Sequence, residues 1–214
     1  MLGRKKQLIL SFVWVLANLI AVIAASLVVL TLYVRLEINR YVYAENWLRA
    51  VSSLAICGIA QGLIVGGLPT IVFKAANLRV KGWFTINLAS MTVGMILPIM
   101  LALIINFIFG IPRNFDGYVI GGWLLSWILA GVFSGFIVGR GKNQKIAWGL
   151  INIAAYLLWG IATIAGIIVL GAALDNPKDS SSILLGSFSI LMPILAIGAW
   201  LNNYIFLGLM DRQS

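Results

Sequence analysis

The sequence contains no histidine, one cysteine and only six acidic residues among its 214 residues. Without histidine there is no imidazole to act as a general base near neutral pH or as a metal ligand. The single cysteine, Cys57, excludes a disulfide within the chain, and its apolar surroundings predict a buried small hydrophobe. The acidic residues lie in predicted loops or at predicted helix ends, whereas proton pumps and intramembrane proteases need ionisable groups inside the membrane. We therefore expect no enzyme, no metal site and no cofactor.

Charge is also scarce, at 10% of residues, while 62% are hydrophobic and the mean hydropathy is +1.04. A soluble domain of this length would carry about a quarter charged residues. Six apolar stretches reach the roughly 20 residues that a helix needs to cross a bilayer. They lie near Leu8–Val34, Trp47–Phe73, Trp83–Phe109, Tyr118–Val138, Ile146–Leu170 and Ile183–Leu209. The fold class predicted is all-α, a polytopic bundle of six transmembrane helices forming a single membrane domain over residues 1–214.

The formal net charge of +9 comes from basic residues that are distributed unevenly between the two predicted sides of the membrane. Ten of the 15 basic residues fall on the side of the N-terminus: Arg4, Lys5, Lys6, Lys74, Arg79, Lys81, Arg140, Lys142, Lys145 and Arg212. Short loops rich in Lys and Arg stay in the cytoplasm, so both termini are predicted to be cytoplasmic. The basicity indicates topology and attraction to membrane lipid, and no nucleic-acid partner. The expected location is a bacterial inner membrane or a thylakoid membrane.

Two helix hairpins, at about 47–109 and 118–170, carry the same pattern. Each has glycines four residues apart, at Gly58, Gly62 and Gly66 and at Gly131, Gly135 and Gly139. Each continues with Trp-x-x-Ile-Asn-x-Ala, at 83–89 and 148–154. Such glycine zippers let another backbone approach closely inside a membrane. We predict an internal two-helix repeat. One alternative is that the two hairpins match by chance, because membrane helices use few residue types. The other is an inverted repeat of three plus three helices around Pro98 and Pro193.

The first hairpin has eight additional residues after its glycines, and they follow Gly66-Gly67-Leu68-Pro69. Proline removes a backbone donor and clashes with the preceding turn, so Gly66, Gly67 and Pro69 are predicted to form a hinge. The residues 70–81 then alternate apolar and basic side chains, as in a short segment lying in the membrane interface. A plain continuation of the helix into a basic loop is an equal alternative.

The polar side chains expected within the membrane are neutral, and most are amides. We predict a small ligand-binding site lined by Gln61, Asn87, Asn152 and Asn202. Gln61 and Ser134 occupy equivalent positions beside the middle glycine of each hairpin. Helix-to-helix hydrogen bonding is the competing interpretation, because buried polar groups normally satisfy one another. The deeper tryptophans are expected to pack in the core or face lipid: Trp14, Trp127, Trp159 and Trp200.

Two resemblances bear on function. One pattern in this chain is similar to a pattern in uncharacterised multi-pass membrane proteins of cyanobacteria. It consists of Gly58-Ile59-Ala60-Gln61 and of residues 78–84, Leu-Arg-Val-Lys-Gly-Trp-Phe. The six helices and the stripe Ala17, Ala21 and Ala25 resemble the substrate-binding subunit of energy-coupling-factor vitamin transporters. The second resemblance implies that the alanine stripe meets a transport subunit.

Three functions are compatible with these features. The first is a non-enzymatic transport-type module that binds or passes a small, mostly uncharged solute. The second is a scaffold or assembly subunit that docks the helices of other membrane protein subunits through its glycine zippers. The third is a lipid-binding protein that works through its basic loops. Zippers facing outward would favour the scaffold, and zippers buried within one chain would favour transport.

Overall fold

The computed structural model describes residues 4–38, 46–78, 80–109, 115–139, 142–175 and 180–211. The helices are α1 (Arg4–Arg35), α3 (Trp47–Ala75), α4 (Trp83–Phe109), α5 (Phe115–Val138), α6 (Lys142–Asp175) and α7 (Ser180–Asp211). Each of the six apolar stretches predicted from the sequence lies inside one of these helices. The prediction of six helices is therefore confirmed.

All six helices are long and apolar enough to cross a membrane. Their candidate spans run from 20 residues in α5 to 31 residues in α1. At 1.5 Å per residue, even the shortest reaches the roughly 30 Å of a hydrocarbon core. Large apolar side chains cover the outside of the described bundle, as expected of a surface that faces lipid rather than water.

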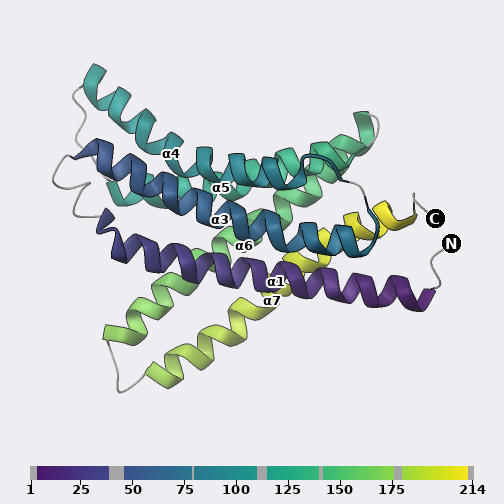
Figure 1. Cartoon of the computed structure of the whole chain (residues 1–214). Helices are drawn as coiled ribbons and strands as arrows, with labels where there is room; N and C mark the ends of the chain where they lie inside the picture. Colours follow the sequence, from purple (N-terminus) through teal and green to yellow (C-terminus); the bar gives the residue numbers. More distant parts are fainter. Residues whose placement is uncertain are drawn as a thin grey trace.

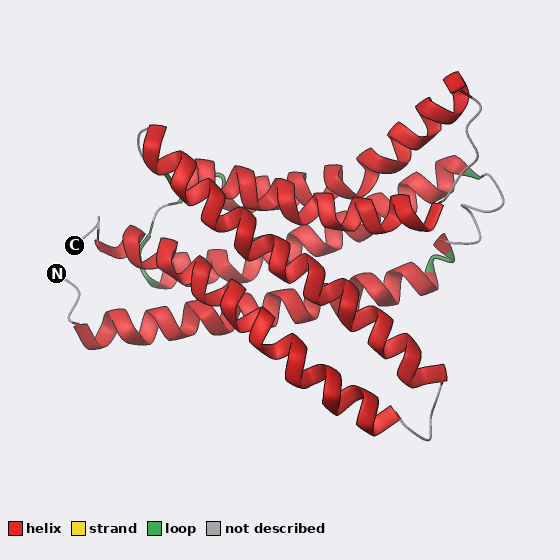
Figure 2. Cartoon of the chain, turned by 180° about the vertical axis from the view of Figure 1, so that it is seen from behind, coloured by secondary structure: helices red, strands yellow, loops and turns green. Residues whose placement is uncertain are grey.

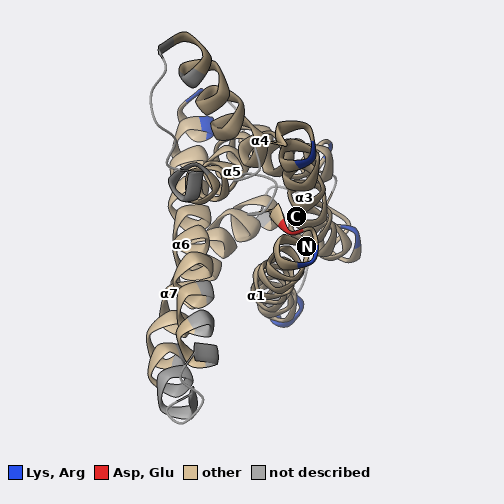
Figure 3. Ribbon diagram, turned by 90° about the vertical axis from the view of Figure 1, so that its left-hand side faces the viewer, with Lys and Arg blue, Asp and Glu red and all other residues tan. Residues whose placement is uncertain are grey.

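The helices follow one another around the bundle in chain order (Figures 1 and 3). Each helix packs against the next one, and α7 closes the ring by packing against α1. In addition, α1 contacts α6 across the ring. Both ends of the chain lie at the same end of the bundle (Figure 1).

The bundle opens at the end opposite the termini. There the hairpin of α6 and α7 diverges from α1, and the last turns of α4 diverge on the other side (Figures 1 and 2). Pro98 lies inside α4 and Pro193 lies inside α7, and proline is a common cause of helix bending.

The helix α3 continues through the predicted hinge. Pro69 lies inside it, and it ends only at Ala75, where Asn77 adopts a positive φ of 57°. The Leu78 amide then donates to the Phe73 carbonyl at 2.8 Å, as in a left-handed helix cap. Residues 70–75 thus continue α3 and residues 76–78 form a turn. The prediction of a separate segment lying in the interface is wrong for these residues.

The glycines of both hairpins lie against the next helix of the same chain. A Cβ added to Gly58 or Gly62 of α3 would stand 2.7 Å from Thr92 Cα or 2.6 Å from Leu88 Cα of α4. A Cβ added to Gly131 or Gly135 of α5, or to Gly139 directly after it, would stand 2.5–2.8 Å from the backbone of α6. A third contact, which the sequence did not predict, brings Gly94 of α4 against Ser126 of α5.

Buried apolar residues form two clusters. One lies toward the termini and includes Trp14, Phe73 and Phe206, whose rings stack or tilt against one another at 4.6–6.2 Å between centroids. The larger cluster occupies the rest of the bundle and includes Met91 and Trp127. Ala21 and Ala25 of the alanine stripe are also buried among the helices of this chain.

Candidate functional site

A layer of neutral polar side chains separates the two apolar clusters. On α1, Asn18 lies between Trp14 of the first cluster and Val22 of the second. Four other helices carry a buried polar residue at the corresponding position: Asn87 on α4, Ser134 on α5, Asn152 on α6 and Asn202 on α7. All five are almost completely buried. We call these five residues the polar layer.

One chain of hydrogen bonds runs through this layer and joins four helices. The Trp14 indole N–H donates to Asn202 Oδ1 at 3.1 Å, and Asn202 Nδ2 donates to Asn152 Oδ1 at 2.8 Å. Asn152 Nδ2 then donates to Ser134 Oγ at 3.3 Å, and the Ser134 hydroxyl donates to the Ala130 carbonyl. Each amide uses both its oxygen and its nitrogen. This arrangement ties α1, α7, α6 and α5 together.

A second, shorter chain attaches α4. The Tyr156 hydroxyl donates to Asn87 Oδ1 at 3.0 Å, and Asn87 Nδ2 donates to the Trp83 carbonyl at 2.9 Å. Tyr156 is fully buried on α6 and also neighbours Ser134 of the first chain. Both chains end on main-chain carbonyls, so the polar layer is satisfied internally.

Gln61 stands apart from this layer. It lies on α3 between Cys57 and Val65, both members of the larger apolar cluster, and it has no exposed surface. Within the described part of the chain, neither Gln61 Oε1 nor Gln61 Nε2 has a hydrogen-bond partner. An unmade hydrogen bond on a buried polar group costs about 1–3 kcal/mol. A donor and an acceptor are therefore held unused inside the bundle.

The four residues predicted for the ligand site are thus placed in two environments. Asn152 and Asn202 are bonded to each other, and Asn87 joins them through the Tyr156 and Ser134 side chains. Gln61 is not brought into this group. The residue of α3 that lies next to the polar layer is Gly66 of the predicted hinge. A Cβ on Gly66 would stand 3.2 Å from Asn87 Cβ.

Three residues of the hydrogen-bond chains, Ser134, Tyr156 and Trp14, were not among the predicted site residues. Tyr156 follows Asn152 by four residues and therefore shares its helix face, which is a signal that the sequence did contain. Trp14 bonds Asn202 across 188 residues. No local pattern indicates that pair, because it depends on the closure of the helix ring.

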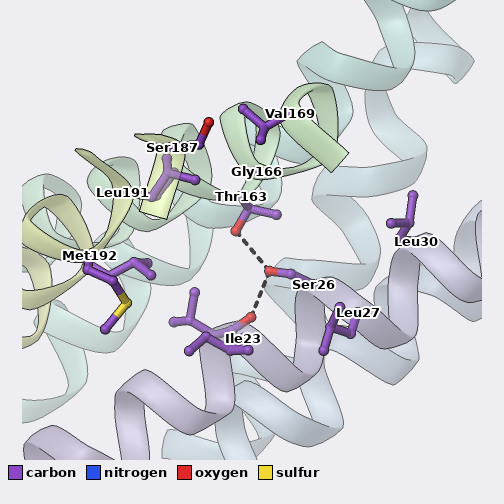
Figure 4. A pocket seen from close by; sticks show the side chains of 13 residues that line it. Ile23, Ser26, Leu27, Leu30, Thr163, Gly166, Val169, Ser187, Leu191 and Met192 are labelled. Atoms are coloured by element: carbon purple, nitrogen blue, oxygen red, sulfur yellow. Dashed lines mark hydrogen bonds between the residues drawn. The ribbon is translucent and has the colours of Figure 1, made fainter. Parts of the chain in front are cut away.

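A groove lies on the outer surface of the bundle, between α1, α6 and α7. It encloses about 260 Å³ and is lined by side chains that include Ile23, Leu27, Leu191 and Met192 (Figure 4). Its position follows from the divergence of the α6–α7 hairpin from α1. Pockets for drug-sized ligands hold roughly 300–1,000 Å³, so this groove suits a small molecule or one end of a longer one.

One polar contact crosses this apolar groove. Ser26 Oγ of α1 and Thr163 Oγ1 of α6 lie 2.9 Å apart (Figure 4). Ser26 Oγ also donates to the Val22 carbonyl at 2.7 Å.

The chemistry available to these sites is that of hydrogen bonding and apolar contact. Within the ranges that the structure describes, no three His, Cys, Asp or Glu side chains lie close enough to hold a metal ion. The polar residues buried there are all Asn, Gln, Ser or Thr. In comparisons with protein families, curated proteins and solved structures, nothing matches this chain.

Proposed function

We propose that this chain is a non-enzymatic membrane module that binds or passes a small, mostly uncharged molecule, and that Gln61 contacts this molecule. The observation that supports the proposal most directly is the unused amide of Gln61, fully buried and without a partner among the described residues. A primary amide offers two donors and one acceptor oxygen, so it matches a ligand that carries both kinds of group.

The neutrality of the interior supports an uncharged ligand. The polar residues buried in the described bundle carry no formal charge. A charged solute would need an opposite charge or a metal ion beside it to offset its desolvation. A neutral molecule with a carbonyl, a hydroxyl or an amide group needs only hydrogen bonds, which Gln61 can provide.

The polar layer has a supporting role in this proposal. Its side chains make hydrogen bonds that link five helices, and Gln61 lies beyond it in the apolar cluster. Gly66, Gly67 and Pro69 lie on α3 at the level of the layer, and Pro69 has no N–H to donate to the Val65 carbonyl. We propose this segment as the hinge that lets a ligand reach Gln61.

The proposal places the chain in a bacterial inner membrane or a thylakoid membrane, with both termini in the cytoplasm. The exposed Lys5, Lys74, Lys81 and Lys142 lie at the helix ends on the side of the termini, and they support this orientation together with contact to anionic lipid. An internal repeat of α3–α4 and α5–α6 is part of the same proposal. It is supported by the similar contacts of Gly62 and Gly135 with the following helix.

The second candidate is a scaffold subunit that docks partner helices. The glycines of α3 and α5 are covered by α4 and α6 of the same chain, and Ala21 and Ala25 are buried. These small-residue faces are therefore already used within one chain. This observation supports the solute-binding proposal over the scaffold.

The experiment compares wild-type protein with Gln61→Met in lipid nanodiscs. Native mass spectrometry of protein extracted gently from its own membrane identifies any small mass that survives mild activation. Thermal shifts are then measured with a panel of neutral amides, polyols and ketones. We expect a compound that stabilises the wild type and leaves Gln61→Met unchanged. A wild type without any bound mass or shift overturns the proposal, and a stoichiometric complex with other membrane proteins would establish the scaffold.

A further inference from the structure

The groove between α1, α6 and α7 is separate from Gln61, and its opening faces the lipid. Ile23 and Leu27 on its α1 side are 40% and 56% exposed. Across from them, Leu191 and Met192 of α7 and Gly166 of α6 complete the wall (Figure 4). In a membrane, a molecule dissolved in the bilayer would enter this groove sideways, without crossing the polar layer.

Two hydroxyls inside the groove, Ser26 and Thr163, already use their protons. Ser26 has one hydroxyl proton, and it donates this proton to the Val22 carbonyl at 2.7 Å. The contact of 2.9 Å between Ser26 Oγ and Thr163 Oγ1 therefore uses the proton of Thr163. Thr163 Oγ1 keeps unused lone pairs. Ser187, the third hydroxyl of the lining, is engaged in an interaction of its own.

The groove thus offers a hydrogen-bond acceptor surrounded by apolar side chains. The oxygen of an ester or ketone carbonyl is itself an acceptor, so it could not form a hydrogen bond with Thr163 Oγ1. Two acceptors facing each other are unfavourable in an apolar site. A hydroxyl group can donate to Thr163 Oγ1 while its hydrocarbon body contacts the apolar lining. Ser26 lies nine residues before Arg35, or about 14 Å along α1, so this acceptor is below the depth of lipid headgroups.

We propose that the groove binds a membrane-soluble alcohol, a long-chain or isoprenoid hydrocarbon that ends in one hydroxyl, and that Thr163 Oγ1 accepts its proton. The volume of about 260 Å³ holds the hydroxyl end, and the remaining hydrocarbon extends into the bilayer through the open side. This site does not depend on Gln61 or on the function proposed above.

The test uses two photoactivatable probes in nanodiscs that contain the full chain. One is a twelve-carbon alcohol with a diazirine in its alkyl chain, and the other is its methyl ether, which lacks the hydroxyl proton. Peptide mass spectrometry locates and quantifies the crosslinks. We expect labelling of α1, α6 and α7 at the groove, with about fivefold more from the alcohol, as one neutral hydrogen bond provides.

Variants separate the hydrogen bond from the cavity. Thr163→Val keeps the shape of the side chain and should make the alcohol and the ether label equally. Ser187→Ala should retain the preference for the alcohol. Gly166→Leu should fill the groove and abolish labelling, because a Cβ there stands at an ordinary 3.7 Å from Leu191 Cδ1. Gly186→Leu is the matched control, since a Cβ on Gly186 has nothing within 4 Å.

Two results would overturn this proposal. Equal labelling of the wild type by alcohol and ether would show that no proton is accepted in the groove. Labelling that persists in Gly166→Leu would show that the probes bind elsewhere. Because Thr163→Val is nearly isosteric, it tests the proposal even if the bulkier Gly166→Leu fails to fold.

Discussion

The amide nitrogen of Asn202 donates to the amide oxygen of Asn152 at 2.8 Å, and this bond links α7 to α6 across 50 residues of sequence. Asn202 is held from its other side by Trp14 of α1, so it stands at the point where the last helix closes on the first. A buried amide that uses both of its polar atoms fixes the rotation of its helix as well as its position. We infer that this pair sets the register of ring closure.

The first prediction concerns this pair. Asn152→Leu should lower the stability of the bundle by roughly 1–2 kcal/mol, because Asn202 Nδ2 and Ser134 Oγ lose a partner while remaining buried. Thermal unfolding in detergent of single and double variants measures this effect. Since Asn202→Leu removes the same bond, the double variant should lose less than the two single variants added together. Additive losses would contradict a direct coupling.

Two features of this fold can be predicted from the sequence: the limits of the helices and the places where glycine allows a close approach. The limits of the helices follow from hydropathy, and the segment Trp83–Phe109 agrees with α4 at both ends. The sequence also predicts that another backbone approaches Gly62 closely, because only glycine permits such an approach, but it leaves open whether that helix belongs to the same chain. Both features depend on local composition, and for this reason one sequence is sufficient to predict them.

The candidate site is less predictable. Gln61 and Ser134 occupy equivalent positions in the two hairpins, yet Ser134 joins the hydrogen bonds of the polar layer and Gln61 has no partner among the described residues. The difference arises because the longer Gln61 side chain lies on α3, which packs against α1 and α4, whereas α5 packs against α4 and α6. The groove depends on the tilt of α6 and α7, which neighbouring helices determine and hydropathy does not.

A second prediction tests the close approach of α3 and α4. Gly62→Ala should destabilise the protein by roughly 1–3 kcal/mol, because the new Cβ would stand 2.6 Å from Leu88 Cα and the helices would have to separate. Gly67→Ala is the control on the same helix, since its Cβ would meet only Phe84 Cε2, at 4.0 Å. The control should be neutral or slightly more stable, as alanine favours helix. Thermal unfolding of both variants distinguishes steric overlap from a general effect of replacing glycine.

A third prediction concerns orientation. In a Cys57→Ala background, Lys142→Cys should react with a membrane-impermeant maleimide only when the cytoplasmic face is accessible, and Arg49→Cys only from the opposite face. Both positions are exposed at helix ends, Lys142 on the side of the termini and Arg49 at the other end. Labelling of intact cells and of inverted membrane vesicles measures this. The reverse pattern would place the termini outside and contradict the distribution of basic residues.

The last prediction asks whether Gln61 is kept for function at the expense of stability. Replacing a buried, unpartnered amide with an apolar side chain of similar length removes its desolvation cost, so Gln61→Met should raise the free energy of unfolding by about 1–2 kcal/mol. Asn87→Met is the matched control. Its amide accepts from Tyr156 and donates to the Trp83 carbonyl, so the same replacement there should destabilise. Stabilisation at Gln61 alone, together with loss of ligand-induced thermal shifts, is the signature of a binding residue. Destabilisation by Gln61→Met would instead mean that the amide is satisfied in the folded protein and supports the bundle as its neighbours do.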